Sequence, residues 1–92
     1  MEKYKFQTPY EFEGEKYEEI ALDLDSVSGW MIEQATRLYR RNGGMATMPY
    51  VDGEWCVYIL HNITKKPLEF FKGLPAKDYC ALNVLVTNFF VG

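Results

Sequence analysis

The last fourteen residues of the chain, YCALNVLVTNFFVG, contain no charged side chain. At helical spacing this segment and the residues just before it carry two apolar stripes on different faces. The first stripe consists of Tyr79, Leu82, Val86 and Phe89, with Phe90 beside it. The second stripe consists of Ala76, Cys80, Val84 and Val91. A helix that rests on one small core needs only one stripe, so the second predicts contact with another copy or with a client chain.

Length and composition predict one small domain spanning residues 1–92. The chain is 48% hydrophobic and 25% charged, which is ordinary for a globular protein. Its net charge of −3 argues against a dedicated nucleic-acid-binding protein. The uncharged segment is shorter than the roughly 20 apolar residues that span a bilayer, and no apolar run follows the N-terminal lysines. We therefore expect no membrane association, no secretion signal and a location in the cytoplasm of the cell that makes the protein.

Residues 3–24 predict a β-hairpin. Aromatic and polar side chains alternate with a period of two through residues 4–12. Pro9 has no N–H to donate, so this strand lies at an edge or bulges there. The pair Glu13-Gly14 supplies the turn. Tyr17 has the opposite parity to the other apolar residues of the return strand, so it either packs elsewhere or marks a shift of register.

Three main helices and one short helical turn are predicted to follow the hairpin, which makes the fold class α+β. Ser26 or Ser28 is expected to cap the first helix. Asp52 is expected to cap the second, whose apolar residues follow one face. The expected bounds are Gly29 to Arg41, Asp52 to Thr64, the turn Leu68 to Gly73, and Pro75 to Phe90.

The stretch of residues 42–51, NGGMATMPYV, predicts a loop. Two interpretations of its methionines remain open. Met45 and Met48 either form a flexible contact surface, or they tuck under the domain as parts of a plain connector.

Phe70 and Phe71 are neighbours on the short helical turn. Adjacent residues on a helix point about 100° apart, so we expect at most one to be fully buried and the other to be free for contact. The candidate partner-binding residues are Met45, Met48, Phe70, Phe71, Phe89 and Phe90. The candidate self-association residues are Cys80, Val84 and Val91.

The sequence offers little for catalysis, and we expect no enzyme and no cofactor. It contains no recognisable catalytic motif, and the single His61 and two cysteines do not complete a zinc set. We expect Cys56 and Cys80 to be small apolar residues of the interior. Five glutamates around the hairpin form either a solvated face or an acidic contact patch. The run from Arg37 to Arg41 either completes a helix end or touches a phosphate.

The order of these elements resembles the tail assembly chaperones of long-tailed phages and prophages. The resemblance rests on the hairpin YKFQTPYEFEGEKYEEIALDL (residues 4–24), a helix after a Ser-rich start, and a second helix. It continues through PLEFFKGLPAKD (residues 67–78) into a helix that ends in VTNFF. It covers nearly the whole chain. The chain departs from the family where Gly43-Gly44 and the two methionines replace a more usual acidic and apolar entry to the second helix.

The resemblance implies a protein that binds the long, helical tape measure protein, keeps it soluble and helps to recruit tail tube subunits. It also implies self-association, absence from finished virions and, in many relatives, a second, longer form made by ribosomal frameshifting, of which this chain would be the short form. Two competing hypotheses are a structural tail completion or tube component and a small cytoplasmic adaptor or antitoxin-like regulator.

Overall fold

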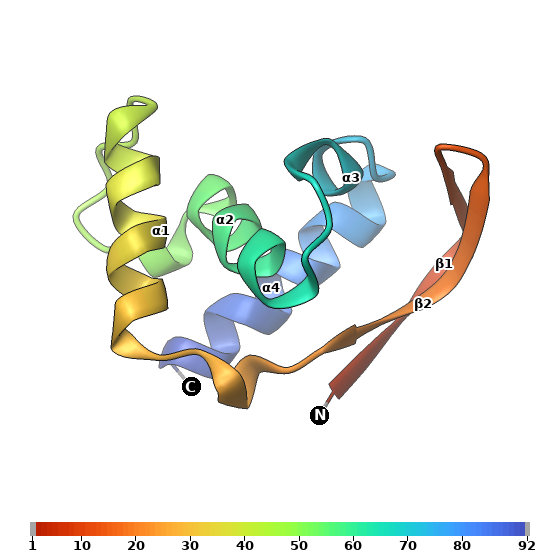
Figure 1. The fold of residues 1–92 in the computed structure, drawn as a ribbon, viewed down its shortest axis with the longest axis horizontal. Coiled ribbons are helices and arrows are strands. Elements are labelled where there is room, and N and C mark those ends of the chain that lie inside the picture. Colours follow the sequence, from red (N-terminus) through yellow and green to blue (C-terminus); the bar gives the residue numbers. More distant parts are fainter. Residues whose placement is uncertain (1, 92) are drawn as a thin grey trace.

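The computed structural model describes residues 2–91, and of Glu2 and Tyr50 it describes the backbone only. An N-terminal antiparallel hairpin is followed by helices, as the sequence predicts (Figure 1). Two short 3-10 turns, η1 and η2, precede α1 and α2. The elements are β1 (Glu2–Phe12), β2 (Glu15–Leu22), η1 (Leu24–Ser26), α1 (Gly29–Arg41), η2 (Pro49–Val51), α2 (Gly53–Thr64), α3 (Leu68–Lys72) and α4 (Ala76–Val91).

The hairpin turns at Glu13 and Gly14, both of which have positive φ angles, as a tight two-residue turn requires. Its register shifts between Lys5 and Tyr10, the stretch of β1 that contains Pro9. Lys5 pairs with Glu19 and Tyr10 pairs with Tyr17, so β1 advances three residues more than β2. An odd shift reverses parity, which places Tyr17 on the same face as Tyr10. The register shift therefore accounts for the misplaced parity of Tyr17.

The helix boundaries follow the predicted caps. Ser28 caps α1 by accepting the N–H of Met31 at 3.4 Å, while the hydroxyl of Ser26 donates to the carbonyl of Asp23 within η1. Asp52 caps α2 by accepting the N–H of Glu54 at 2.9 Å. These local bonds satisfy backbone donors that would otherwise lack partners at a helix start.

Helix α2 lies at the centre of the molecule, among α1, α3 and α4, and near the end of β2 (Figure 1). Six consecutive residues from Trp55 to Leu60 are buried, so every face of this part of the helix is covered. The sequence predicted a single apolar face for this helix, and that prediction understates the burial. The physical reason is that neighbours enclose α2 on all sides, which no periodicity within the helix reveals.

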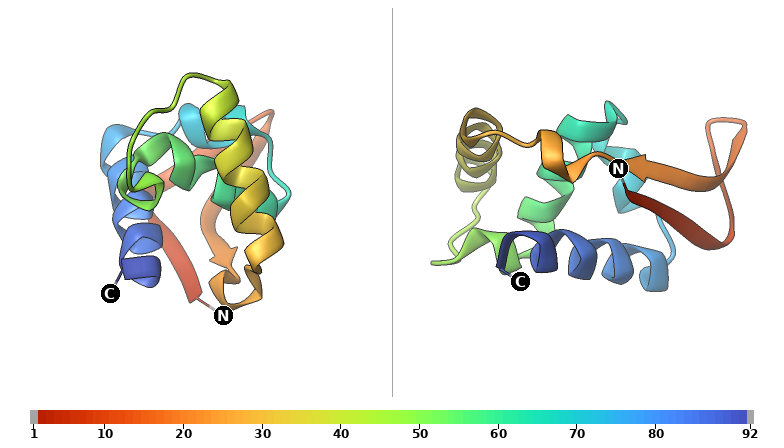
Figure 2. Two further views of the ribbon diagram at one scale, coloured as in Figure 1. Left: turned by 90° about the vertical axis from the view of Figure 1, so that its left-hand side faces the viewer. Right: turned by 90° about the horizontal axis from the view of Figure 1, so that it is seen from below.

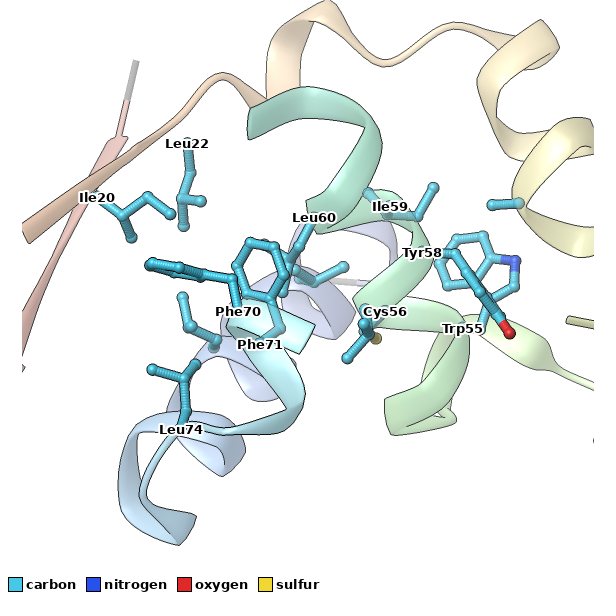
Figure 3. Packing of buried hydrophobic residues seen from close by; sticks show 14 of the residues in the cluster. Ile20, Leu22, Trp55, Cys56, Tyr58, Ile59, Leu60, Phe70, Phe71 and Leu74 are labelled. Atoms are coloured by element: carbon cyan, nitrogen blue, oxygen red, sulfur yellow. The ribbon is translucent and has the colours of Figure 1, made fainter. Parts of the chain in front are cut away.

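The expectation that Phe70 or Phe71 is free for contact is wrong, because both side chains are fully buried. Helix α3 is packed between the hairpin and α2, so two directions about 100° apart both meet apolar neighbours. The Phe70 ring lies on the side of Ile20 and Leu22, and the Phe71 ring lies toward Leu60 (Figure 3).

Phe70 is the aromatic centre beneath the hairpin. Tyr10, Phe12 and Tyr17 each place a ring centroid 5.0–5.2 Å from that of Phe70, in edge-to-face geometry. The hydroxyl of Tyr10 also donates to the carbonyl of Phe70 at 3.0 Å. Such aromatic pairs stabilise beyond the area they bury, so the hairpin is attached to α3 along its length.

Helix α4 has the predicted phase at Leu82 and Val86, whereas Phe89 of the same stripe is exposed. Leu82 and Val86 are buried, as are Ile59 and Leu60 of α2, while Leu38 of α1 is half-buried at the edge of the same core. The N-terminal turn of α4 carries the buried Asp78, which accepts a hydrogen bond from the Tyr4 hydroxyl at 2.5 Å and from the Gln7 N–H at 3.3 Å. The hairpin is therefore held to α4 as well as to α3.

Candidate interaction surface

Large apolar side chains are exposed in three places. The first is the loop between α1 and α2, the second is the outer side of α4 with its C-terminal end, and the third is the start of α1. The exposed residues are Trp30, Met45, Met48, Val51, Val84, Phe89 and Val91. We call Met45, Met48 and Val51 the loop surface, and we call Cys80, Val84 and Val91 the outer face of α4.

Two glycines shape the loop that carries the methionines. Gly43 has a φ of 93°, a left-handed conformation that favours glycine. Gly44 lies against the buried ring of Tyr39, and a Cβ there would come within 2.4 Å of the ring. The loop can therefore fold back over Tyr39 only because residue 44 has no side chain.

Tyr39 fixes the loop through its hydroxyl group. The hydroxyl donates to Oδ2 of Asp52 at 3.0 Å and accepts the N–H of Ala46 at 3.0 Å. Asp52 in turn caps α2 through its other carboxylate oxygen. The middle of the loop is therefore attached to both α1 and α2, between the two methionines.

This attachment leaves the methionines outside. Met45 is 87% exposed and Met48 is 48% exposed, whereas Ala46 between them packs against the core. Of the two interpretations of the loop, the one in which the methionines tuck under the domain is wrong. An exposed methionine pair on a fixed loop is a flexible, polarisable surface on a rigid base.

The loop surface lies beside α4. The 3-10 turn η2 contacts both α2 and α4, and Figure 2 shows the segment that leads into α2 beside α4. The start of α2 is also tight against α4, since a Cβ on Gly53 would lie 2.8 Å from the amide nitrogen of Asn83. Val51 of the loop surface is thus a neighbour of α4.

The outer face of α4 is exposed along its length, as the second stripe of the sequence predicts. Cys80 borders a groove of about 430 Å³ between α4 and the start of α2. The expectation that both cysteines are interior residues holds for Cys56 alone, because Cys80 is exposed. Burial raises the pKa of the Cys56 thiol.

The end of α4 separates Phe89 from Phe90. Phe90 packs edge-to-face on the buried Trp55 with a centroid distance of 5.5 Å, so it belongs to the border of the core. Phe89 is 44% exposed, and the centroid of its ring lies 5.1 Å from that of Phe90. Of these two candidate contact residues, Phe89 is the one that a partner can reach.

The single histidine is engaged in local structure. Nδ1 of His61 donates to the carbonyl of Lys66 at 2.5 Å, which closes the turn after α2. Within residues 2–91, no group of three or more His, Cys, Asp or Glu side chains is placed to hold a metal ion. Over the same residues, no helix combines the length and apolar character needed to cross a membrane.

Sequence reasoning missed two exposed residues and one buried one. Trp30 is 81% exposed on the side of α1 opposite Ala35. Val51 lies in a 3-10 turn, where no periodicity marks its face. Asp78 gave no signal, because its partner Tyr4 is far away in the sequence.

The positions of the candidate residues thus divide them into two groups. Phe70, Phe71 and Phe90 belong to the core or its border, whereas the other candidate residues are exposed. Comparisons of the chain with models of protein families, with curated protein sequences and with solved structures found no match.

Proposed function

We propose that this protein is a tail assembly chaperone of the kind that serves long-tailed phages. It binds the tape measure protein, keeps it soluble and promotes assembly of tail tube subunits around it. It acts in the host cytoplasm, is absent from the mature virion and has no enzymatic activity. The observation that carries this proposal is the loop surface, whose exposed methionines stand on a loop fixed by Tyr39.

The chemistry of the client explains why such a surface is useful. A long α-helical protein with apolar seams aggregates when those seams are uncovered. Methionine side chains adapt to irregular apolar partners, and an amphipathic helix binds by laying its apolar side against such a surface. Met45, Met48 and Phe89 are the proposed client contacts. The acidic balance of the remaining chain keeps the chaperone itself in solution.

The outer face of α4 has a separate role in the proposal. Cys80, Val84 and Val91 form an apolar stripe that no part of residues 2–91 covers. We assign this stripe to self-association, which lets several copies line one long client. Light scattering across a concentration series is expected to show species larger than a monomer, and a monomer at high micromolar concentration would contradict the assignment.

Client binding is tested by co-expression with the tape measure protein of the same phage. Wild-type chaperone is expected to raise the soluble fraction of the tape measure protein. The double variant Met45→Ser/Met48→Ser is expected to stay folded and to lose most of that effect. Thr47→Ser, in the same exposed loop, is the matched control and should behave as wild type.

Two results would count against the chaperone proposal. If the double methionine variant rescues the tape measure protein as well as wild type, the loop surface is not the client contact. If mass spectrometry finds the protein in purified virions in proportion to the tube subunits, it is a structural tail component instead.

A further inference from the structure

The outer face of α1 is unlike the rest of the surface. Trp30, Gln34, Arg37 and Arg41 follow the spacing i, i+4, i+7 and i+11, so they share one side of the helix. All four are exposed, and they lie opposite the buried pair Ala35 and Tyr39. Tryptophan and arginine are the residues most enriched at binding hot spots, so this composition marks an interaction surface.

The charge of this face is free for a partner. Arg37 has a 3.9 Å ion pair with Glu33, but both side chains are more than 60% exposed, and such pairs contribute little. Arg40 lies on the neighbouring side of the helix. Its guanidinium donates a hydrogen bond to the carbonyl of Gly44 and lies over the Tyr39 ring. Three arginines against one glutamate give α1 a net charge of +2 in a chain whose total is −3.

The hairpin carries the opposite charge. Residues 2–22 contain six glutamates and three lysines, a net charge of −3. Lys65 and Lys66 line a groove with Glu13 and Glu15 on one side of the hairpin, and Glu19 forms an ion pair with Lys3. Glu11 and Glu18 are exposed and take no part in an ion pair among the described residues, although Glu11 lies directly across the hairpin from Lys16.

The two charged elements cannot meet within one molecule. Figure 1 shows α1 at one end of the longest axis and the hairpin at the other, and the right-hand view of Figure 2 agrees. The molecule measures 34 Å along that axis. Neutralisation of one element by the other therefore requires two molecules.

We propose that the outer face of α1 docks the hairpin of a second copy at its exposed Glu11 and Glu18, so that copies join head to tail. The contact is heterologous, and each added copy leaves one free α1 face and one free hairpin. This contact would be a second route to the self-association that the proposed function includes, and the inference rests in part on that function. The contact on α4 is apolar, whereas this one is driven by charge and weakens with salt.

A charge-swap experiment tests the contact. The variants are Arg37→Glu/Arg41→Glu on α1 and Glu11→Lys/Glu18→Lys on the hairpin, all at exposed positions. Sedimentation velocity at low salt is expected to show that each variant alone associates at least about tenfold more weakly than wild type. An equimolar mixture of the two is expected to regain association, because the reversed face meets the reversed hairpin. Asp25→Lys/Glu69→Lys makes the same change of charge as the hairpin variant, at exposed positions outside α1, the hairpin and α4, and is the control.

Trp30 supplies a second, direct measurement. The chain has two tryptophans, and Trp55 is buried while Trp30 is exposed. On association at low salt, acrylamide quenching of tryptophan fluorescence is expected to fall in wild type. In the Arg37→Glu/Arg41→Glu variant it should stay at the monomer value.

The outcomes separate this contact from the one on α4. If Val84→Asp gives monomers while Arg37→Glu/Arg41→Glu sediments as wild type, the α4 contact stands and the head-to-tail contact is wrong. If the reverse is found, the head-to-tail contact stands without the α4 contact. Failure of the mixed variants to regain association would also overturn it. The head-to-tail contact would also be wrong if wild type binds a single-stranded DNA probe, and Arg37→Glu/Arg41→Glu loses that binding but sediments as wild type does. The outer face of α1 would then be a site for phosphates.

Discussion

The hydroxyl of Tyr4 donates a 2.5 Å hydrogen bond to Oδ1 of Asp78, joining two residues 74 positions apart. Asp78 is the buried charged residue of the described chain, and it lies in the first turn of α4, where the helix dipole favours a carboxylate. The bond fastens the start of the hairpin to the start of the last helix.

Removal of this hydroxyl should destabilise the protein. Tyr4→Phe leaves the Asp78 carboxylate with the weaker 3.3 Å bond from Gln7, and an incompletely satisfied buried acceptor costs about 1–3 kcal/mol. Urea unfolding followed by circular dichroism measures the change. Tyr17→Phe is the control, because the Tyr17 hydroxyl donates to the exposed Glu15 and accepts from Lys66 at 3.3 Å, so its loss leaves no buried carboxylate without a donor. Equal stability of the two variants would contradict the role of the bond.

The same pair predicts how stability depends on pH. Burial, followed by the hydrogen bond and charge of Asp78, raises the pKa of Tyr4 from 10.0 to about 12. The folded protein holds this proton more tightly than the unfolded chain, so the contribution is complete below pH 10 and is lost as the pH rises through about 12. Burial raises the pKa of Tyr10 as well, which acts in the same direction. As the pH rises through this range, the urea concentration at the midpoint of unfolding should fall less steeply for Tyr4→Phe than for wild type.

The phase of α4 is tested by a matched pair of truncations. Leu82 is buried, so Leu82→Ala should destabilise the protein by about 2–5 kcal/mol. Val84, two residues later, is exposed on the outer face of α4, and Val84→Ala should change stability by less than about 0.5 kcal/mol. Thermal melting at a concentration that favours monomers compares them. A similar loss in both variants would mean that both faces of α4 are covered.

The loop depends on the missing side chain of Gly44. Gly44→Ala places a Cβ within 2.4 Å of the Tyr39 ring, so it should destabilise the protein and move Met45 and Met48. Gly29→Ala is the control, because a Cβ there meets nothing within 4 Å and alanine favours a helix. The melting temperature and the rescue of the client should both fall in Gly44→Ala. Neither should fall in Gly29→Ala.

Thiol labelling distinguishes the two cysteines. Cys80 is exposed, whereas Cys56 is buried and its thiol has a raised pKa, so the reactive thiolate is scarce there. A thiol reagent under native conditions should modify one cysteine per chain, and mass spectrometry should place the label on Cys80. Slower labelling as protein concentration rises would support the α4 contact.

Local chemistry predicted much of this fold correctly. The alternation in residues 4–12, the turn at Glu13-Gly14, and the caps Ser28 and Asp52 depend on neighbours in the sequence. The two stripes of α4 were also readable, because a helix repeats its faces at a fixed interval. The outer face of α4, formed by Cys80, Val84 and Val91, followed from that repeat.

Burial that depends on distant neighbours could not be read in this way. Adjacent Phe70 and Phe71 are both enclosed because the hairpin and α2 approach α3 from different sides. The register shift between Lys5 and Tyr10, rather than a different packing site, puts Tyr17 on the ring of Phe70. Periodicity describes one helix or strand, whereas these contacts depend on how several of them meet.

Local patterns in the chain were enough to show which segments are helical or extended, where they begin, and that α4 has more apolar surface than one core needs. The packing of the elements was needed to show that α2 is central, that the loop methionines stay outside, and that Trp30, Arg37 and Arg41 lie opposite the buried side of α1. The reason is that hydrogen bonds of caps and turns form between residues close in the chain. The exposure of a side chain depends on every element that can cover it, and those elements come from the whole length of the chain.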